Sequence, residues 1–230
     1  MYLCIMATIL NLETSTKNCS VSIAKDGVQL CLVEESAESF AHGEKLNQFI
    51  DWCIEGAEIE WKDLDAISVS KGPGSYTGLR IGVSSAKGFA FGLDLPLIAI
   101  NSLQILAESQ LNKGYDLIIP MIDARRMEVY TAQFDTTGNQ LTDTEAKVID
   151  ETSFEELKGK KIVFVGDGAD KCKEALAHLD ATFVQIFPSA QFMCGVAEKR
   201  FNQKSFEDVA YFEPYYLKDF VAGKKKSEEK

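Results

Sequence analysis

Hydrophobic and polar positions alternate in two neighbouring segments near the start of the chain. Residues 19–24 (CSVSIA) and 28–34 (VQLCLVE) both show the two-residue period of a half-buried strand. The dipeptide Asp26-Gly27 between them is a strong hairpin signal. An apolar run at 7–13 (ATILNLE) precedes this pair, so we predict three successive antiparallel strands.

A helical period replaces the alternation in the next segment. Apolar side chains recur at helical spacing over 46–57, at Leu46, Phe49, Ile50, Cys53 and Ala57. Strand and helix then alternate, with a strand at 64–70, a helix at 77–93, a strand at 97–100 and a helix at 102–111. The first half of the chain is therefore predicted to place strands first and alternating helices and strands afterwards.

The second half repeats this order of elements. Its predicted elements are strands at 116–123, 127–134, 141–149 and 161–165, a helix at 169–178, a strand at 182–187 and a helix at 189–202. Ser153 and Glu156 form a capping-box pattern that predicts a short helix. The repetition predicts an α/β protein with two lobes, residues 1–103 and 104–230. We leave open whether the C-terminal segment packs back on the first lobe.

Composition and charge narrow the classes of function. Of the 230 residues 46% are hydrophobic, and 24 Lys and Arg stand against 35 Asp and Glu, a net charge of −11. This balance is typical of a globular protein and weighs against a chain that binds nucleic acid by itself, because phosphate binding requires clustered cations. The basic run Lys224–Lys226 is interpreted as a solvated tail. We find no apolar run of the roughly 18 residues that a membrane helix needs.

The cysteine and histidine content argues against a metal centre. The six cysteines include no CxxC pair, and the two histidines, His42 and His178, lie far apart in the sequence. Oxidised frameworks belong mostly to much smaller secreted chains. We therefore expect reduced thiols, no bound metal and a cytoplasmic location.

The most distinctive motif is SKGPGSYTGLRIG at 70–82, where a predicted strand leads through a glycine loop into a helix. Gly72 and Gly74 allow backbone angles and close approaches that other residues forbid. Ser75 or Thr77 can cap the helix, whose free N–H groups suit an anion. An anion site and a plain structural turn are both consistent with this pattern, and the structural turn is favoured. No GK[ST] follows, so the loop is not a Walker motif.

Small residues follow one side of the helix after this motif. That side carries Gly78, Gly82, Ser85, Phe89 and Gly92, whereas Leu79, Val83, Ala86 and Ala90 form an apolar side. A glycine inside a helix costs about 1 kcal/mol relative to alanine, so another backbone is expected to pack closely there. Two interpretations stay open, namely packing on the chain's own sheet and contact with a partner helix.

A charged hairpin is predicted near residue 125. Asp123, Arg125, Arg126 and Glu128 lie together in the sequence between two predicted strands. Turns are polar because they are solvated, so we interpret this group as a solvated turn rather than a catalytic cluster.

These motifs resemble the bacterial TsaB (YeaZ) family over almost the whole chain. The resemblance is carried by ILNLETST near the start, HGEKL at 42–46, SKGPGSYTGLRIG at 70–82, PLI at 96–98 and PYYL at 214–217. It implies a two-lobed fold of the actin, Hsp70 and sugar-kinase superfamily, with duplicated ribonuclease H-like lobes. The family's usual opening fits a start at Met6 better than one at Met1.

The resemblance also implies a function. Members of the family take part in making N6-threonylcarbamoyladenosine at position 37 of tRNAs that read ANN codons. In that system TsaD transfers the carbamoyl group, TsaB is its non-catalytic partner, and the ATPase TsaE joins them. TsaD-like proteins hold a metal with an HxxxH pair, and the matching positions here are Ser102 and Leu106. Leucine cannot ligate a metal, so the sequence excludes the catalytic paralogue.

The nucleotide loop of the superfamily is also altered. Kinases of this superfamily open with an Asp-x-Gly-Thr loop, whereas the matching segment 13–16 reads ETST and has no glycine. We predict a degenerate nucleotide or anion site that binds ATP or ADP weakly at most, or only at a complex interface. Its candidate residues are Glu13, Thr14, Ser15, Gly72, Gly74, Ser75, Gly166 and Gly168.

We therefore predict a non-catalytic scaffold that binds TsaD and TsaE and reaches tRNA only through the complex. The predicted partner interface consists of Leu46, Phe49, Ile50, Cys53, Gly78, Gly82, Ser85, Ala86 and Phe89. The same faces are expected to support a homodimer when TsaD is absent. The main alternative is an ATP-binding enzyme, a small-molecule kinase or an ATPase, that uses the cleft between the lobes. A third hypothesis, a glycoprotease, finds neither metal ligands nor a nucleophile–base pair.

Overall fold

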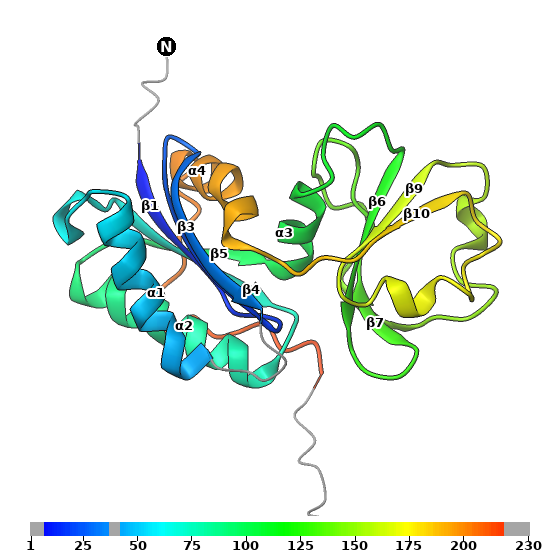
Figure 1. Cartoon of the computed structure of the whole chain (residues 1–230), viewed down its shortest axis with the longest axis horizontal. Helices are drawn as coiled ribbons and strands as arrows, with labels where there is room; N and C mark the ends of the chain where they lie inside the picture. The colour runs from blue at the N-terminus through cyan, green and yellow to red at the C-terminus, as the bar shows by residue number, and fades with distance from the viewer. Residues whose placement is uncertain (1–6, 37–41, 219–230) are drawn as a thin grey trace, which may run out of the picture.

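The computed structural model describes residues 7–36 and 42–218, so the start codon and the basic tail lie outside the described residues. Its strands form two sheets that stand side by side (Figure 1). The first sheet has the order β3-β2-β1-β4-β5, with β1 Thr8–Glu13, β2 Asn18–Lys25, β3 Val28–Ser36, β4 Ala66–Gly72 and β5 Leu97–Asn101. Asp26 and Gly27 both have left-handed φ angles, which confirms the predicted hairpin between β2 and β3.

The second sheet repeats the first. Its order is β8-β7-β6-β9-β10, with β6 Leu117–Asp123, β7 Glu128–Thr131, β8 Glu145–Val148, β9 Ile162–Val165 and β10 Ala181–Val184. In each sheet three antiparallel strands are followed by two parallel ones. This shared order confirms the predicted fold of two similar α/β lobes.

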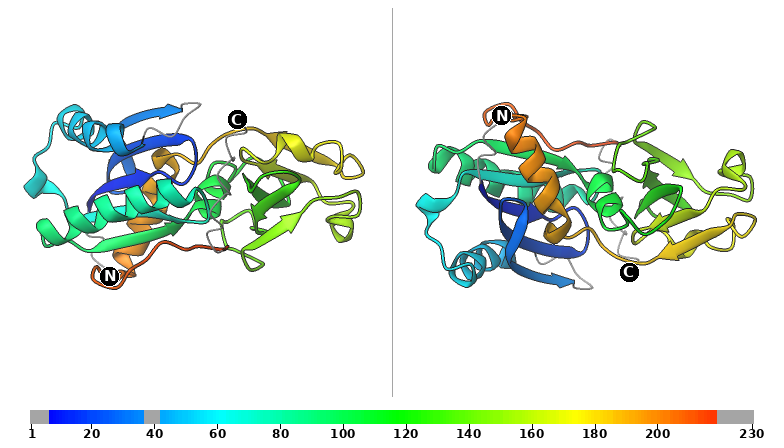
Figure 2. Two further views of the ribbon diagram at one scale, coloured as in Figure 1. Left: turned by 90° about the horizontal axis from the view of Figure 1, so that it is seen from below. Right: turned by 90° about the horizontal axis from the view of Figure 1, so that it is seen from above.

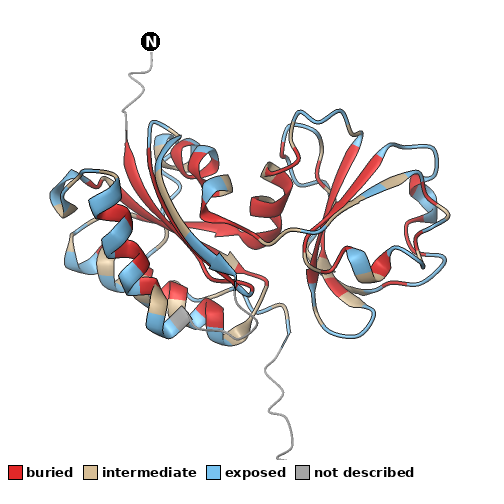
Figure 3. Ribbon diagram, in the orientation of Figure 1, coloured by how far each residue is buried: buried red, intermediate tan, exposed pale blue. Residues whose placement is uncertain are grey.

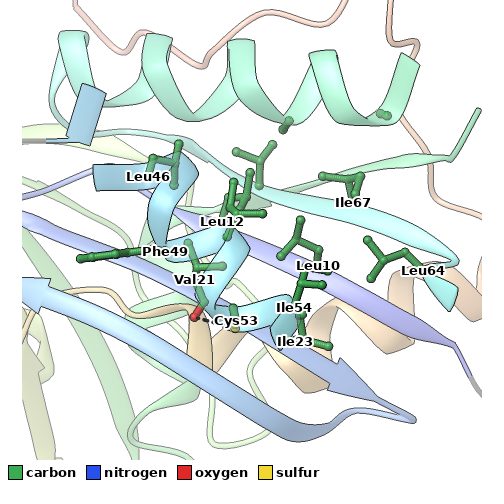
Figure 4. Close-up of a cluster of buried hydrophobic side chains, with 14 of the residues drawn as sticks. Leu10, Leu12, Val21, Ile23, Leu46, Phe49, Cys53, Ile54, Leu64 and Ile67 are labelled. Atoms are coloured by element: carbon green, nitrogen blue, oxygen red, sulfur yellow. Dashed lines mark hydrogen bonds between the residues drawn. The ribbon is translucent and has the colours of Figure 1, made fainter. Parts of the chain in front are cut away.

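Two long helices cover one face of the first sheet, α1 His42–Gly56 and α2 Tyr76–Gly92. Figure 4 shows the core beneath them, where Leu46 and Phe49 of α1 meet Leu12 and Val21 of the sheet. Full burial of a Leu or Phe side chain contributes about 1.5–3 kcal/mol, so this cluster accounts for much of the stability of the lobe. The short helix η1 Trp61–Asp63 packs Trp61 against the same cluster.

The opposite face of the first sheet is covered by elements from the end of the chain. The two views in Figure 2 show α2 on one side of this sheet and α4 Cys194–Asn202 on the other. The 3₁₀-helix η4 Ala190–Met193 precedes α4 and joins the same core. Beyond α4 the chain continues along the first sheet, where the Glu207 N–H donates to the Leu97 carbonyl. The C-terminal segment therefore returns to the first lobe.

The helix α3 Ser102–Glu108 joins the two lobes. Its Ile105 packs in the core of the first sheet, and its Leu103 and Leu106 pack against the second. Figure 3 shows α3 as buried between the sheets. Within residues 7–36 and 42–218, no helix has both the length and the apolarity to cross a membrane.

The helices of the second lobe are shorter than the sequence predicts. The predicted helix at 169–178 is wrong, because only η3 Asp170–Cys172 and successive turns form there. Many of their hydrogen bonds join residues three apart, which tightens the chain while still burying Cys172 and Leu176. The predicted capping box is also wrong, since Phe154 is left-handed and only η2 Glu155–Leu157 follows it.

The Ser153 side chain serves a turn instead of a helix. Its Oγ accepts a hydrogen bond from the Asp150 N–H and donates one to the Asp150 carboxylate, at 3.0 and 2.9 Å. The side chain is thereby unavailable to cap a helix, which is the physical reason for the failure of that prediction.

Candidate functional site

The glycine loop between β4 and α2 packs against the loop that follows β1. The Ser75 N–H donates to the Ser15 carbonyl at 2.6 Å. A Cβ added to Gly74 would lie under 3.0 Å from that carbonyl oxygen, closer than real Cβ atoms come. Ser75 caps α2, because its Oγ accepts a hydrogen bond from the Gly78 N–H at 3.3 Å. Of the two predicted caps, Ser75 and Thr77, the structure therefore uses Ser75.

The loop is also closed from the C-terminal side. Gly72 has a φ of +110°, and a Cβ added there would lie 2.6 Å from the Tyr215 carbonyl oxygen. The Tyr215 N–H donates to the Lys71 carbonyl at 2.7 Å. Both glycines are therefore explained by contacts within the chain, and no ligand is needed to account for them.

Glu13 lies at the centre of this arrangement and is fully buried. Its Oε1 accepts a hydrogen bond from the Ser15 N–H at 2.5 Å. Burial raises the pKa of Glu13 from an ordinary value of 4.5 to about 7, and hydrogen bonds from Ser15 and Ser70 offset only part of that effect. At neutral pH the carboxyl is therefore partly protonated, which weakens it as a ligand for a metal–phosphate group.

Gly166 and Gly168 lie in the second lobe, directly after β9. Gly166 has a φ of +132°, and an added Cβ would come under 3.0 Å from the Met121 carbonyl oxygen. The Gly168 N–H donates to that same oxygen at 2.9 Å. The structure thus groups six candidates of the nucleotide or anion site in the first lobe, and it uses Gly166 and Gly168 to pack the second lobe against β6.

The side of α1 predicted to meet a partner is buried inside the chain itself. Leu46, Phe49, Ile50 and Cys53 are each at most 4% exposed and belong to the core of the first sheet. Cys53 also donates a weak hydrogen bond to the Val21 carbonyl at 3.7 Å (Figure 4). The prediction that these four side chains contact a partner is therefore wrong, because the sheet already covers them.

The small side of α2 is buried as well. Gly78 and Gly82 face Thr14, whose Oγ1 donates to the Gly78 carbonyl at 2.8 Å. A Cβ on Gly82 would come under 3.0 Å from Thr14 Oγ1. Gly78 and Gly82 therefore pack inside the chain, as in the first of the two interpretations, whereas Gly92 at the end of the stripe is exposed. Ala86 is buried in the core, and the partner-interface prediction is corrected for Gly78, Gly82 and Ala86.

Ser85 and Phe89 are only partly buried. Phe89 stacks on Trp61 of η1 with ring centroids 5.1 Å apart, so it too has an intramolecular partner. The outer face of α2 was missed by the sequence analysis. There Arg80, Ser84, Gly88 and Phe91 are exposed at spacings of about one helical turn.

An exposed aromatic side chain lies on each of the two helices. Phe91 is 83% exposed, and Trp52 of α1 is 48% exposed while stacking on Phe49 at 5.8 Å. A Cβ on Gly88 would meet no atom within 4 Å, so no packing inside the chain explains this helical glycine. The sequence alone does not distinguish this face, because Gly78 and Gly82 place the same residue type on the other side of the helix.

Comparison with known proteins identifies the family. Residues 35–226 match the family model described as "TsaD: tRNA N6-adenosine threonylcarbamoyltransferase". The "tRNA threonylcarbamoyladenosine biosynthesis protein TsaB" of Escherichia coli (strain K12) is 31% identical, over 94% of this chain and 97% of that protein. The chain belongs to the TsaB family. A protein of the same name from Bacillus subtilis (strain 168) is 29% identical over 92% of this chain and 94% of its own.

A solved structure supports the fold of this TsaB-family chain. YeaZ from Pseudomonas aeruginosa superposes with a TM-score of 0.80 at 24% identity, covering 92% of this chain and 100% of the other. Together with the repeated strand order, this likeness confirms the two-lobed fold that the resemblance implied.

The positions that would hold the TsaD-type metal do not fit a metal in this TsaB-family chain. Ser102 and Leu106 are both fully buried, and Leu106 packs among apolar side chains of the second lobe. Among the described residues, no group of three or more His, Cys, Asp and Glu side chains is arranged to hold a metal ion. Leu106 has no donor atom, so this pair of positions cannot hold a metal as two histidines would.

Proposed function

We propose that this chain acts in tRNA threonylcarbamoyladenosine biosynthesis as a non-catalytic subunit that binds TsaD. The names of its relatives support the pathway. The observation that supports binding is a set of exposed residues on α1 and α2, namely Trp52, Ser84, Gly88 and Phe91. We call these four residues the outer helical face.

Gly88 is the strongest single argument for a helix contact at this face. Glycine within an exposed helix costs about 1 kcal/mol relative to alanine. Gly82 is explained by its contact with Thr14, whereas Gly88 has open space around it. A helix of a partner can approach the backbone closely there, with Ser84 one turn before it.

Two aromatic side chains supply the apolar area that a stable interface needs. Phe91 is almost fully exposed, and nothing in the described part of the chain covers it. Trp52 contributes a second large ring from the neighbouring helix. Aromatic residues of this kind are enriched among those that dominate the free energy of association.

The non-catalytic role is supported by the two altered sites. Ser102 and Leu106 cannot form the metal pair, and Glu13 is buried under the chain's own glycine loop. In this proposal TsaD supplies the chemistry, TsaE joins the pair, and the outer helical face supports a homodimer when TsaD is absent. Weak or absent binding of ATP by the isolated chain stays a prediction, and calorimetry with ATP and Mg²⁺ tests the alternative of an ATP-dependent enzyme.

The experiment compares Phe91→Asp with Leu141→Asp. Both residues are large and exposed, but Leu141 lies in the second lobe, before β8. A buried charge at the interface is expected to weaken TsaD binding at least a hundredfold by calorimetry, and Leu141→Asp is expected to leave it unchanged. Thermal unfolding of both variants should match that of the original chain. Equal TsaD affinity for Phe91→Asp and the original chain would contradict the proposed interface.

A further inference from the structure

The hairpin between β6 and β7 carries two arginines at an unusual place. Arg125 and Arg126 have φ angles of 73° and 51°, so two consecutive residues adopt the left-handed conformation. Both side chains are exposed, and neither guanidinium has an ion pair or hydrogen bond within the part of the chain that the structure describes.

This backbone conformation favours other residues. Left-handed φ angles cost residues with a Cβ about 1–2 kcal/mol, and glycine, asparagine or aspartate are the usual occupants. Arginine therefore gains nothing here from local conformation or from contacts within the chain. Strained residues of this kind are a reason to look for function.

The acids of the hairpin are already paired with lysines. Asp123 forms an ion pair with Lys171, and Glu128 forms one with Lys218. The charges of Arg125 and Arg126 therefore stay uncompensated, although the whole chain carries a net charge of −11. This tip is a local exception to the acidity of the protein.

The C-terminal segment connects the tip to α2. Lys218 reaches the hairpin, and two residues earlier Tyr216 accepts a hydrogen bond from Arg80 Nε at 3.2 Å. The C-terminal segment thus links Arg80 to the hairpin. Figure 2 shows this segment running along α2 towards the second lobe. We call Arg80, Arg125, Arg126 and Lys218 the basic strip.

Aromatic rings accompany the strip at Arg80. Its guanidinium lies over the Tyr76 ring at 4.1 Å, and Tyr76 and Tyr216 have ring centroids 4.9 Å apart. Glu213 is the acid that lines the same hollow between α2 and the C-terminal segment. Guanidinium groups beside exposed aromatic rings are suited to phosphates and unstacked bases of RNA.

We infer that the basic strip contacts the phosphate backbone of the substrate tRNA directly, with Arg125 and Arg126 as the principal cations. The inference rests on the proposed function, because it takes tRNA as the nucleic acid that the complex holds. It differs from the sequence-based prediction, in which this chain contacts tRNA only through its partners. The contact is sequence-independent, since arginine pairs with phosphate oxygens and not with base edges.

The test uses the double variant Arg125→Asn with Arg126→Asn in the complex with TsaD. Asparagine tolerates the left-handed conformation, so the fold is retained and the melting temperature should stay level or rise. Affinity for unmodified tRNA, measured by fluorescence anisotropy, is expected to fall about tenfold. The slope of log affinity against log salt should become shallower by about 1–2, as expected for two lost phosphate contacts.

The matched control is Lys160→Asn with Lys204→Asn. Both lysines are exposed, neither has an ion pair within the described residues, and Lys204 is also left-handed. This control is expected to keep the tRNA affinity and salt slope of the original complex. An equal loss in control and test variants would overturn the inference, because it would show only a general effect of net charge.

Affinity for TsaD without tRNA separates this inference from the proposed function. It should be unchanged in the arginine variant, since Arg125 and Arg126 lie between β6 and β7 in the second lobe. Unchanged tRNA affinity in that variant would overturn the inference that the basic strip contacts tRNA. Lost TsaD affinity with retained tRNA affinity would also overturn it and assign the arginines to an acidic protein surface. If the original chain fails to bind TsaD, the proposed function is wrong. The same tRNA titration with the chain alone then tests whether the basic strip contacts tRNA.

Discussion

The two lobes place glycines at equivalent points and then diverge. Gly72 ends β4 and Gly166 directly follows β9, each with a positive φ. The second glycine of each pair, Gly74 or Gly168, packs on the segment at the end of β1 or β6. In the first lobe a long helix follows this turn, whereas in the second only η3 does. Both lobes therefore pack their glycine turn on the equivalent segment. The first lobe differs in the long helix that follows the turn and is partly exposed to solvent.

The acids at the ends of the equivalent strands β1 and β6 also differ. Glu13 is buried beneath the glycine loop, whereas Asp123 is exposed and paired with Lys171. Its neighbour Asp167 has a pKa raised to about 6, mainly by burial and also by the charge of Asp123. Neither arrangement reproduces a pair of ionised acids facing a common ligand.

The largest expected effect comes from filling the glycine turn of the first lobe. Gly74→Ala places a Cβ against the Ser15 backbone, which cannot move aside as a side chain can. We expect a loss of about 3 kcal/mol or more in the free energy of unfolding, measured by urea titration. Gly168→Ala meets the Val129 side chain first, at 2.9 Å, and should lose about 1 kcal/mol. Equal losses would show that the two turns are packed alike.

A second prediction concerns the pH dependence of stability. The folded-state pKa of Glu13 is raised from 4.5 to about 7, so the folded chain binds this proton more tightly than the unfolded chain does. Stability should therefore fall as pH rises from about 4.5 to about 7, and this contribution should be level above that. Glu13→Gln is expected to remove a decline of about 3 kcal/mol between pH 5 and pH 8.

The second lobe supplies the comparison for this pH profile. The decline due to Asp167 should end near pH 6 and persist in Glu13→Gln, because its pKa is raised to about 6. Asp167→Asn should in turn retain the decline between pH 6 and pH 7. Urea titrations of both variants at four pH values separate the two acids. A Glu13→Gln profile identical to that of the original chain would show that Glu13 is ionised throughout.

The strands and the two-lobed repeat could be predicted from the sequence because they depend on local periodicity and turn chemistry. The alternation around Asp26-Gly27 is an example, since register and turn act over a few residues. The side of α2 that is exposed could not be predicted in this way. Gly82 and Gly88 look alike in sequence, and only the position of Thr14 separates them.

The sequence predictions for two segments of the second lobe were wrong for a related reason. Residues 169–178 have helix-forming composition, yet tight turns bury the same apolar positions. Ser153 matches a capping pattern, but its side chain forms hydrogen bonds with Asp150 instead of capping a helix. In each case a neighbouring contact decided the outcome, and single-sequence patterns do not contain that contact.

Hydrogen exchange with and without TsaD tests the central claim most directly, because it reports on both lobes in one experiment. We expect slower exchange in α1 and α2 of the first lobe when TsaD is present, and unchanged exchange in β8, β9 and β10 of the second. Slower exchange confined to the second lobe, with α1 and α2 unchanged, would contradict the assignment of the outer helical face as the TsaD-binding surface.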